Sequence, residues 1–151
     1  MQSQSRRDAL RSLAALAAVS SVVPWAPAVA ADRVPLAIKG YDPVAYFTLG
    51  KPQRGRPDTE FEWDEHRYRF SSAQHRKLFR ADPTRYAPQF PNFCAMSLTR
   101  GEVVEADPEN WLISDGKLYM FGKTVGPALF KQHLAENTAK ANQNRAVIQK
   151  K

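Results

Sequence analysis

The sequence predicts an α+β fold: a small single domain of two β-hairpins, several short helices and a longer C-terminal helix. Residues 60–70 and 111–121 each alternate apolar and polar side chains on both sides of a short turn, as half-buried strand pairs do. Asp-Pro and Ser-Ser pairs precede short apolar patches, as at helix starts. The chain has 151 residues and one cysteine. This length fits one domain, and a lone cysteine excludes a disulfide framework, a zinc finger and an iron–sulfur cluster built from this chain alone.

The first thirty residues have the features of an export signal. The pair Arg6 and Arg7 precedes residues 13–23, which carry no charge and are rich in Ala, Leu and Val. Such a run is too short for a membrane span, which needs about 20 residues, and residues 28–30 read Ala-Val-Ala, as at a cleavage site. The segment resembles a bacterial twin-arginine signal, which implies a periplasmic mature protein. With no cysteine directly after the cleavage region, we expect no lipid anchor and no stable membrane anchor.

The charge of the chain is positive but dispersed. There are 22 Lys and Arg against 15 Asp and Glu, a formal net charge of +7. Apolar residues separate the basic ones, and no dense basic run occurs. We therefore interpret the charge as a solvated basic surface and expect no nucleic-acid partner.

The first part of the mature chain is predicted to form a helix and a hairpin. Asp42 can cap a helix that has Pro43 at its first position. The alternating residues 60–70 then predict two strands that turn at Asp64 and Glu65.

The middle of the chain is predicted to hold short elements. The Ser-Ser pair at 71–72 can cap a short helix, and the Asp-Pro pair at 82–83 starts another turn. Residues 87–93 contain two prolines and should form an ordered loop. Residues 94–98 and 103–104 are predicted as short extended pieces.

The last part is predicted to contain the second hairpin and the C-terminal helix. Asp-Gly at 115–116 is the strongest turn signal in the chain and places the hairpin within 111–121. Gly-Pro at 126–127 opens a single helix that frays over 142–151. Trp63 and Trp111 lie on hairpin strands and are expected to be largely buried.

Several stretches of the mature chain match one family. They are AIKGYDPVAYF (37–47), YRFSS (68–72), FRADPTRYAPQF (79–90), FCA (93–95) and WLISDGKLY (111–119). In these stretches the chain resembles the bacterial exported proteins that carry a YHS domain. The resemblance implies a treble-clef-like domain within residues 31–151, with a core over about 37–135 and a frayed C-terminal tail.

The wider group of YHS and related domains includes metal-handling proteins. These usually have cysteine after the Asp-Pro-Val motif, directly after the Tyr-x-Phe strand, and four residues later. This chain has Ala45, Ser71 and His75 at those places. Of the three, His75 alone keeps a side chain that can bind a metal ion.

Cys94, the only thiol, is the first candidate metal ligand. On an extended strand, Cys94 and Met96 would point the same way. With His75 or His66 they would give a Cys, Met and His set, which suits copper better than zinc. Alternatives are a buried structural Cys94, a reactive thiol, and a His75 that is simply a partly exposed helical residue.

A second candidate site is a Tyr-rich ligand pocket. Tyr41, Tyr46 and Tyr86 carry hydroxyls that need partners if buried, and with Asp42 they could form a polar cluster near Cys94. The alternative is a hydrogen-bond network of these side chains that holds loops together.

The sequence contains no phosphate-binding glycine loop and no Gly-x-Ser-x-Gly motif. A triad of Cys94, His75 and Asp42 would need a geometry that sequence does not reveal. We therefore expect an exported, non-enzymatic protein that binds or senses a metal ion such as copper. The alternatives are a metal-free module that binds a small molecule or a protein partner in a Tyr-rich pocket, and a thiol enzyme that uses Cys94.

Overall fold

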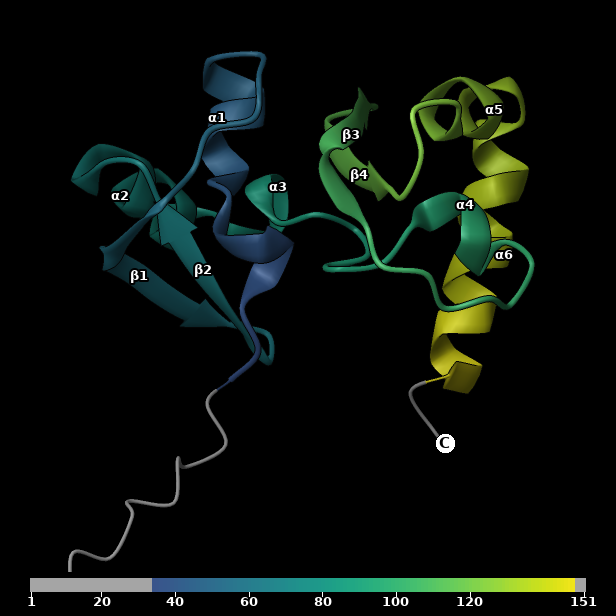
Figure 1. The fold of residues 1–151 in the computed structure, drawn as a ribbon, viewed down its shortest axis with the longest axis horizontal. Helices are drawn as coiled ribbons and strands as arrows, with labels where there is room; N and C mark the ends of the chain where they lie inside the picture. Colours follow the sequence, from purple (N-terminus) through teal and green to yellow (C-terminus); the bar gives the residue numbers. More distant parts are fainter. Residues whose placement is uncertain (1–33, 149–151) are drawn as a thin grey trace, which may run out of the picture. The chain divides into compact units, whose positions relative to one another are not determined.

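Two antiparallel hairpins, each with its own helices, form the α+β fold of the computed structural model, which describes residues 34–148 (Figure 1). These residues belong to one unit, Asp32–Lys151. In chain order the elements are η1 (Ala37–Gly40), α1 (Pro43–Thr48), β1 (Arg56–Trp63), β2 (His66–Phe70), α2 (Ala73–Ala81), α3 (Pro83–Tyr86), α4 (Ala95–Leu98), β3 (Asp107–Ser114), β4 (Lys117–Phe121), α5 (Gly126–Gln132) and α6 (Leu134–Ile148).

Both predicted hairpins are confirmed. Strand β1 pairs with β2 and β3 pairs with β4, and a bulge near the start of β1 and of β3 shifts the register. The turn residues Asp64 and Glu65 have φ of 46° and 62°, and Asp115 and Gly116 have φ of 51° and 70°. Two consecutive positive φ values are what a tight two-residue hairpin turn requires.

The predicted helix caps are confirmed as well. Asp42 Oδ1 accepts a hydrogen bond of 2.9 Å from the N–H of Val44 at the start of α1. Ser72 caps α2, and Asp82 caps α3, each by accepting an N–H bond from the third residue beyond it. These side chains satisfy donors that a helix start leaves free.

Residues 94–98 differ from the prediction, because they form a helical turn and not an extended piece. Cys94 is the N-cap residue of α4, and its carbonyl accepts from the N–H of Leu98 at 3.1 Å. A run this short has no period that separates strand from helix, and α4 is packed against α5 and α6.

The C-terminal region also differs from the prediction. The single helix is two helices, α5 and α6, which meet at His133 with φ −133° and ψ 52°. Helix α6 continues to Ile148 where fraying was expected, because its polar side chains are bound to the fold. Asn144 Nδ2 donates to the carbonyl of Leu98 at 2.7 Å, and Arg145 Nη1 donates to that of Gln89 at 2.8 Å.

The buried side chains form two clusters. The first joins η1, α1, β2 and α2, around Tyr46, Tyr68, Phe70 and Phe79. The second joins α4, β4, α5 and α6, around Phe90, Phe121 and Phe130.

Trp63 and Trp111 are only partly buried, contrary to the expectation. Both lie at the edge of the first cluster, where Trp63 packs on Phe79 (ring centroids 6.1 Å apart) and Trp111 on Tyr46 (5.3 Å). Each indole therefore packs on the cluster and stays partly exposed.

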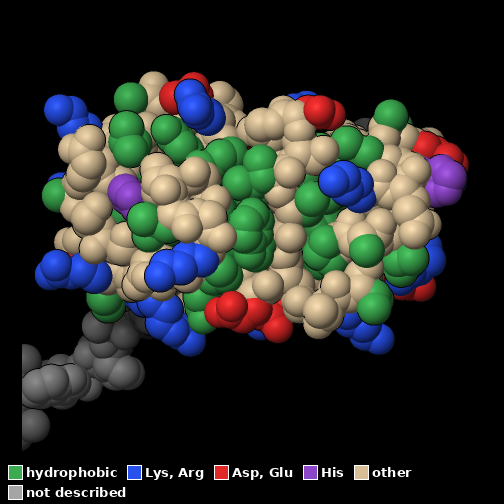
Figure 2. Space-filling model, turned by 90° about the horizontal axis from the view of Figure 1, so that it is seen from above, with side chains coloured by type: hydrophobic (Ala, Val, Ile, Leu, Met, Phe, Trp, Pro, Cys, Tyr) green, Lys and Arg blue, Asp and Glu red, His purple; other side chains and the backbone are tan. Residues whose placement is uncertain are grey.

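The predicted signal, including Arg6 and Arg7, lies outside the described residues. Among residues 34–148, no helix combines the length and the hydropathy of a membrane span. Lys and Arg side chains are scattered over the face drawn in Figure 2, with apolar side chains gathered near its middle.

Candidate functional site

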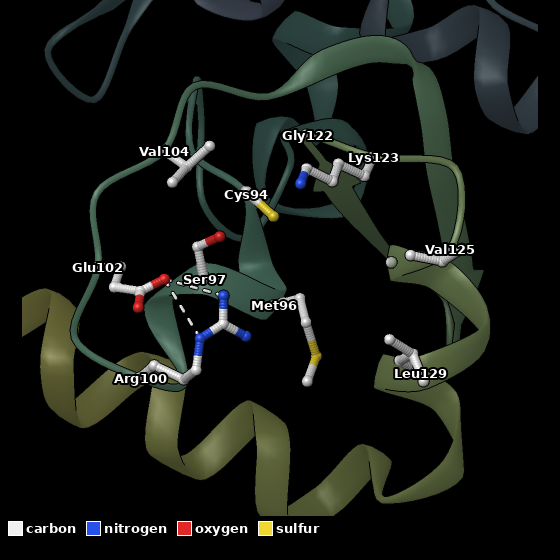
Figure 3. A pocket seen from close by; sticks show the side chains of 11 residues that line it. Cys94, Met96, Ser97, Arg100, Glu102, Val104, Gly122, Lys123, Val125 and Leu129 are labelled. Atoms are coloured by element: carbon white, nitrogen blue, oxygen red, sulfur yellow. Dashed lines mark hydrogen bonds and ion pairs between the residues drawn. The ribbon is translucent and has the colours of Figure 1, made fainter.

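A cavity of about 270 Å³ opens beside the only cysteine (Figure 3). Three parts of the chain meet there: helix α4, the loop that follows it, and the segment from the end of β4 into α5. The lining residues are Cys94, Met96, Ser97, Arg100, Glu102, Val104, Gly122, Lys123, Val125, Gly126 and Leu129. A small ligand fits this volume, which is near the lower end of the roughly 300–1,000 Å³ of small-molecule pockets.

Cys94 is held at the inner side of the cavity by backbone contacts. Its N–H donates to the carbonyl of Val104 at 2.8 Å, which joins the start of α4 to the loop after it. The residue is 5% exposed, so its thiol is reached through the cavity. A Cβ on Gly122 would come within 2.9 Å of the Glu105 carbonyl oxygen and 3.7 Å of Cys94 Cβ. Gly122 therefore permits this close approach of the two segments.

The surroundings of the sulfur favour its ionised form. Burial raises the pKa of the Cys94 thiol, but hydrogen bonds outweigh that effect and lower the pKa overall. The donors are the hydroxyl of Ser97 and the backbone N–H groups of Gly122, Ser97 and Met96. A thiolate is the form that binds soft metals and attacks electrophiles, so Cys94 is better prepared for either than an ordinary buried cysteine.

Apolar side chains form much of the cavity wall and remain exposed. Val104 is 41% exposed, Val125 61% and Leu129 44%. These three come from the loop after α4, from the segment before α5 and from α5 itself. Figure 3 shows Val125 and Leu129 side by side on one side of the cavity, across from the Arg100–Glu102 pair. A ligand that covers them gains hydrophobic free energy of about 2.5 kcal/mol per 100 Å² of apolar surface removed from water.

Three charged side chains line the cavity. Arg100 and Glu102 form an ion pair, in which Glu102 Oε2 accepts from Arg100 Nη2 at 2.9 Å and from Nε at 3.2 Å. Lys123 forms no ion pair with any described residue.

The structure places the predicted metal ligands in two different locations. Cys94 and Met96 both line the cavity. The imidazole of His75, on α2, is instead bound to Asp42, with 2.6 Å between Nδ1 and Oδ2. Its other nitrogen, Nε2, lies 3.2 Å from Thr48 Oγ1. Among the described residues, no group of three or more His, Cys, Asp or Glu side chains could hold a metal ion together. Neither His75 nor Asp42 lines the cavity that Cys94 and Met96 share, so the structure brings together neither the Cys94, His75 and Met96 set nor the triad of Cys94, His75 and Asp42.

Asp42 belongs to the same cluster as His75. Its Oδ2 also accepts from the N–H and the hydroxyl of Ser71, at 2.8 and 2.7 Å. The side chains of Ser71 and His75 therefore meet on a fully buried carboxylate.

The predicted tyrosines lie apart from the cavity. Tyr46 donates from its hydroxyl to the carbonyl of Pro108 at 3.0 Å, and Tyr41 to Glu109 Oε1 at 3.3 Å. Tyr86 is buried, with its ring edge against Phe47. These contacts fit the alternative of a network that holds loops together, since they connect α1 and its flanking residues to the start of β3 and to α3.

A second hollow, of about 460 Å³, lies on α2. It is lined by Ala73, Arg76, Lys77, Arg80 and Ala81. This lining offers cations on a solvated helix but no thiol, hydroxyl or imidazole, so the cavity at Cys94 is the stronger candidate site.

Several cavity residues were not predicted, namely Ser97, Lys123, Val125 and Leu129. The sequence held one signal of these residues: three apolar side chains lie in otherwise polar loops, namely Val103, Val104 and Val125. An apolar residue in a loop does not reveal which distant segment it faces.

None of the family models, curated proteins or solved structures compared with this chain matches it.

Proposed function

We propose that the chain is an exported, non-enzymatic binding module of the YHS type whose ligand site is the cavity at Cys94. Its ligand is a small, largely apolar molecule. The observation that carries this proposal is the cavity of about 270 Å³, walled by the exposed Val104, Val125 and Leu129 beside the only thiol. The export part rests on the sequence around Arg6 and Arg7.

A binding role is favoured over catalysis by the residues around the thiol. No histidine lines the cavity, and its one carboxylate, Glu102, is paired with Arg100. A thiol enzyme needs a base within hydrogen-bond reach of the nucleophile or of a bound water. Hydrogen-bond donors surround the Cys94 sulfur instead.

Filling the cavity tests this proposal. The neutral probe 4-methylpentanamide is titrated into the mature protein while the methyl signals of Val104, Val125 and Leu129 are followed by NMR. We expect these signals to shift and saturate. Val104→Phe, which places a large ring in the cavity wall, should weaken binding at least tenfold.

Val103→Phe is the matched control, because Val103 is also exposed, at 54%, but does not line the cavity. It should bind the probe as the wild type does. Equal binding by both variants, or probe-induced shifts confined to residues outside the cavity, would refute the site.

A second candidate ligand is Cu(I), favoured by one specific observation. Cys94 and Met96 line the same cavity, and the hydrogen bonds to the thiol lower its pKa. A thiolate and a thioether are soft ligands that suit Cu(I). The metal would be held by these two side chains, with no part for His75.

A competition titration with a Cu(I) chelator tests the second candidate. Cys94→Ser should abolish binding, because a hard oxygen replaces the soft donor, and Met96→Leu should weaken it. His75→Ala should leave the affinity unchanged. Unchanged binding by Cys94→Ser, or no binding by the wild type, would exclude Cu(I) from this cavity.

A further inference from the structure

With the Cys94 thiol protonated, the charges that line the cavity sum to one positive charge. Arg100 and Glu102 neutralise each other through two hydrogen bonds on the same carboxylate oxygen. Lys123 remains, and among residues 34–148 it has no carboxylate partner. An amine is positively charged at neutral pH. The cavity therefore presents one uncompensated ammonium group.

Lys123 lines the cavity and is an exposed residue, so its ammonium group stands at the solvent side of the lining. Figure 3 shows the Lys123 side chain extending from its backbone toward Cys94, with its nitrogen on the same side of the cavity as the sulfur. In the same view, the apolar Val125 and Leu129 lie on another side of the cavity. The lining is thus divided into a positively charged end near Cys94 and an apolar part along the start of α5.

We propose that the ligand is a small aliphatic monocarboxylate, with its carboxylate on Lys123 and its hydrocarbon body against Val125 and Leu129. This inference rests on the proposed function, since it names the ligand class of the same cavity.

The lining selects small aliphatic monocarboxylates by their charge and by their size. A carboxylate satisfies one ammonium group by a charge-assisted hydrogen bond, whereas a dianion would keep an unmatched charge beside apolar walls, which costs free energy. A neutral molecule of the same shape would fill the cavity but leave the exposed Lys123 to water, without the gain of a charged hydrogen bond. A long or bulky acid does not fit within about 270 Å³.

An isosteric pair of probes tests the inference. The mature protein is titrated calorimetrically with 4-methylpentanoate and with 4-methylpentanamide, at pH 7 and low salt. The two probes share a hydrocarbon body and differ in charge. We expect the acid to bind about fivefold more tightly than the amide, since charged hydrogen bonds are about twice as strong as neutral ones. The preference should shrink in 0.5 M salt, where exposed charges are screened.

Three variants locate the charge. Lys123→Met keeps the length of the side chain and should reduce the acid-to-amide preference to about one. Lys131→Met is the matched control, because Lys131 lies on α5 but does not line the cavity, and it should keep the preference. Lys123→Gln serves if the Met variant does not fold.

The outcomes distinguish failure of the monocarboxylate inference from failure of the proposed binding function. Equal affinity for acid and amide in the wild type would overturn the monocarboxylate inference and leave the binding module standing. A preference that persists in both Lys123 variants would also overturn it. Binding of neither probe would overturn the proposed function and the inference together.

Discussion

Asp42 Oδ2 lies 2.6 Å from Nδ1 of His75, and the carboxylate that makes this contact is completely buried. The same carboxylate caps α1 through Val44 and accepts two hydrogen bonds from Ser71 at the end of β2. One side chain therefore joins α1, β2 and α2. Because its four acceptor contacts are all with protein groups, the cluster acts as a cross-link within the first half of the fold.

Asp42→Asn should destabilise the protein by about 3 kcal/mol. The amide is neutral, and its NH2 group would face donors that now bind a carboxylate, which leaves buried polar groups unsatisfied. Urea unfolding measures the change. Asp58→Asn is the control, since Asp58 is exposed and paired only with the exposed Arg56 and its neighbour Thr59, and it should change stability by less than about 0.5 kcal/mol. A cost below about 1 kcal/mol for Asp42→Asn would contradict the cross-link.

Two tyrosines provide a matched pair for a second prediction. Tyr46 donates to the carbonyl of Pro108, whereas the buried hydroxyl of Tyr68 has no hydrogen-bond partner among the described residues. Tyr46→Phe should cost about 1–2 kcal/mol, because it leaves a buried carbonyl without its donor. Tyr68→Phe should be neutral or stabilising, because it removes an unsatisfied polar group. Thermal unfolding compares them, and an equal loss in both variants would refute the assignment of partners.

Local signals in the sequence predicted most of the fold. The Asp-Gly turn at 115–116, the Asp42 cap and the Ser72 cap act within a few residues of themselves, so their effect is readable from the chain alone. The break at His133 and the helical turn at α4 were not predicted. The turn at α4 is bound by a residue far along the sequence, through the bond from Asn144 to Leu98. Across the break at His133, the side chain of Asn137 donates to the carbonyl of Phe130 at 3.0 Å, a bond that no residue pattern announces.

The candidate site was predicted only in part. Cys94 and Met96 were expected to share a strand face, and they share a cavity as the N-cap and second residue of a short helix. His75 was expected to join them, but the buried charge of Asp42 binds it elsewhere. The rest of the lining comes from α4, from the loop after it and from residues 122–129. No local pattern indicates that residues 122–129 pack beside α4.

Export gives a third prediction, on residues outside the structure. Replacing both Arg6 and Arg7 with Lys keeps the charge but removes the guanidinium groups that the twin-arginine route requires. Unprocessed precursor should then remain in the cytoplasm, as shown by fractionation and immunoblotting. The single exchange Arg11→Lys is the control and should be exported and processed. Normal export of the double variant would refute the twin-arginine assignment.

The reactivity of Cys94 gives a fourth prediction. Since hydrogen bonds lower its pKa, the rate of its reaction with methyl methanethiosulfonate should reach half its maximum at a lower pH than that of an ordinary thiol, about 8.5. Ser97→Ala removes the one side-chain donor and should move the midpoint upward. Thr99→Ala, a neighbour whose hydroxyl bonds to the Met96 carbonyl, should not move it. A midpoint that is unaffected by Ser97→Ala would show that the hydroxyl does not act on the sulfur.

The same hydrogen bonds make stability depend on pH, with a definite sign. The pKa of Cys94 is lower in the folded protein than in the unfolded chain, so between the two values the unfolded state holds more protons. Stability therefore rises with pH across that window. The gain is complete above the unfolded value, near about 8.5, and it is lost as pH falls through the folded one. The free energy of unfolding of the wild type, minus that of Cys94→Ser, should increase between pH 7 and 9 in urea titrations. A difference that stays level or falls over this range would mean that folding does not favour the thiolate.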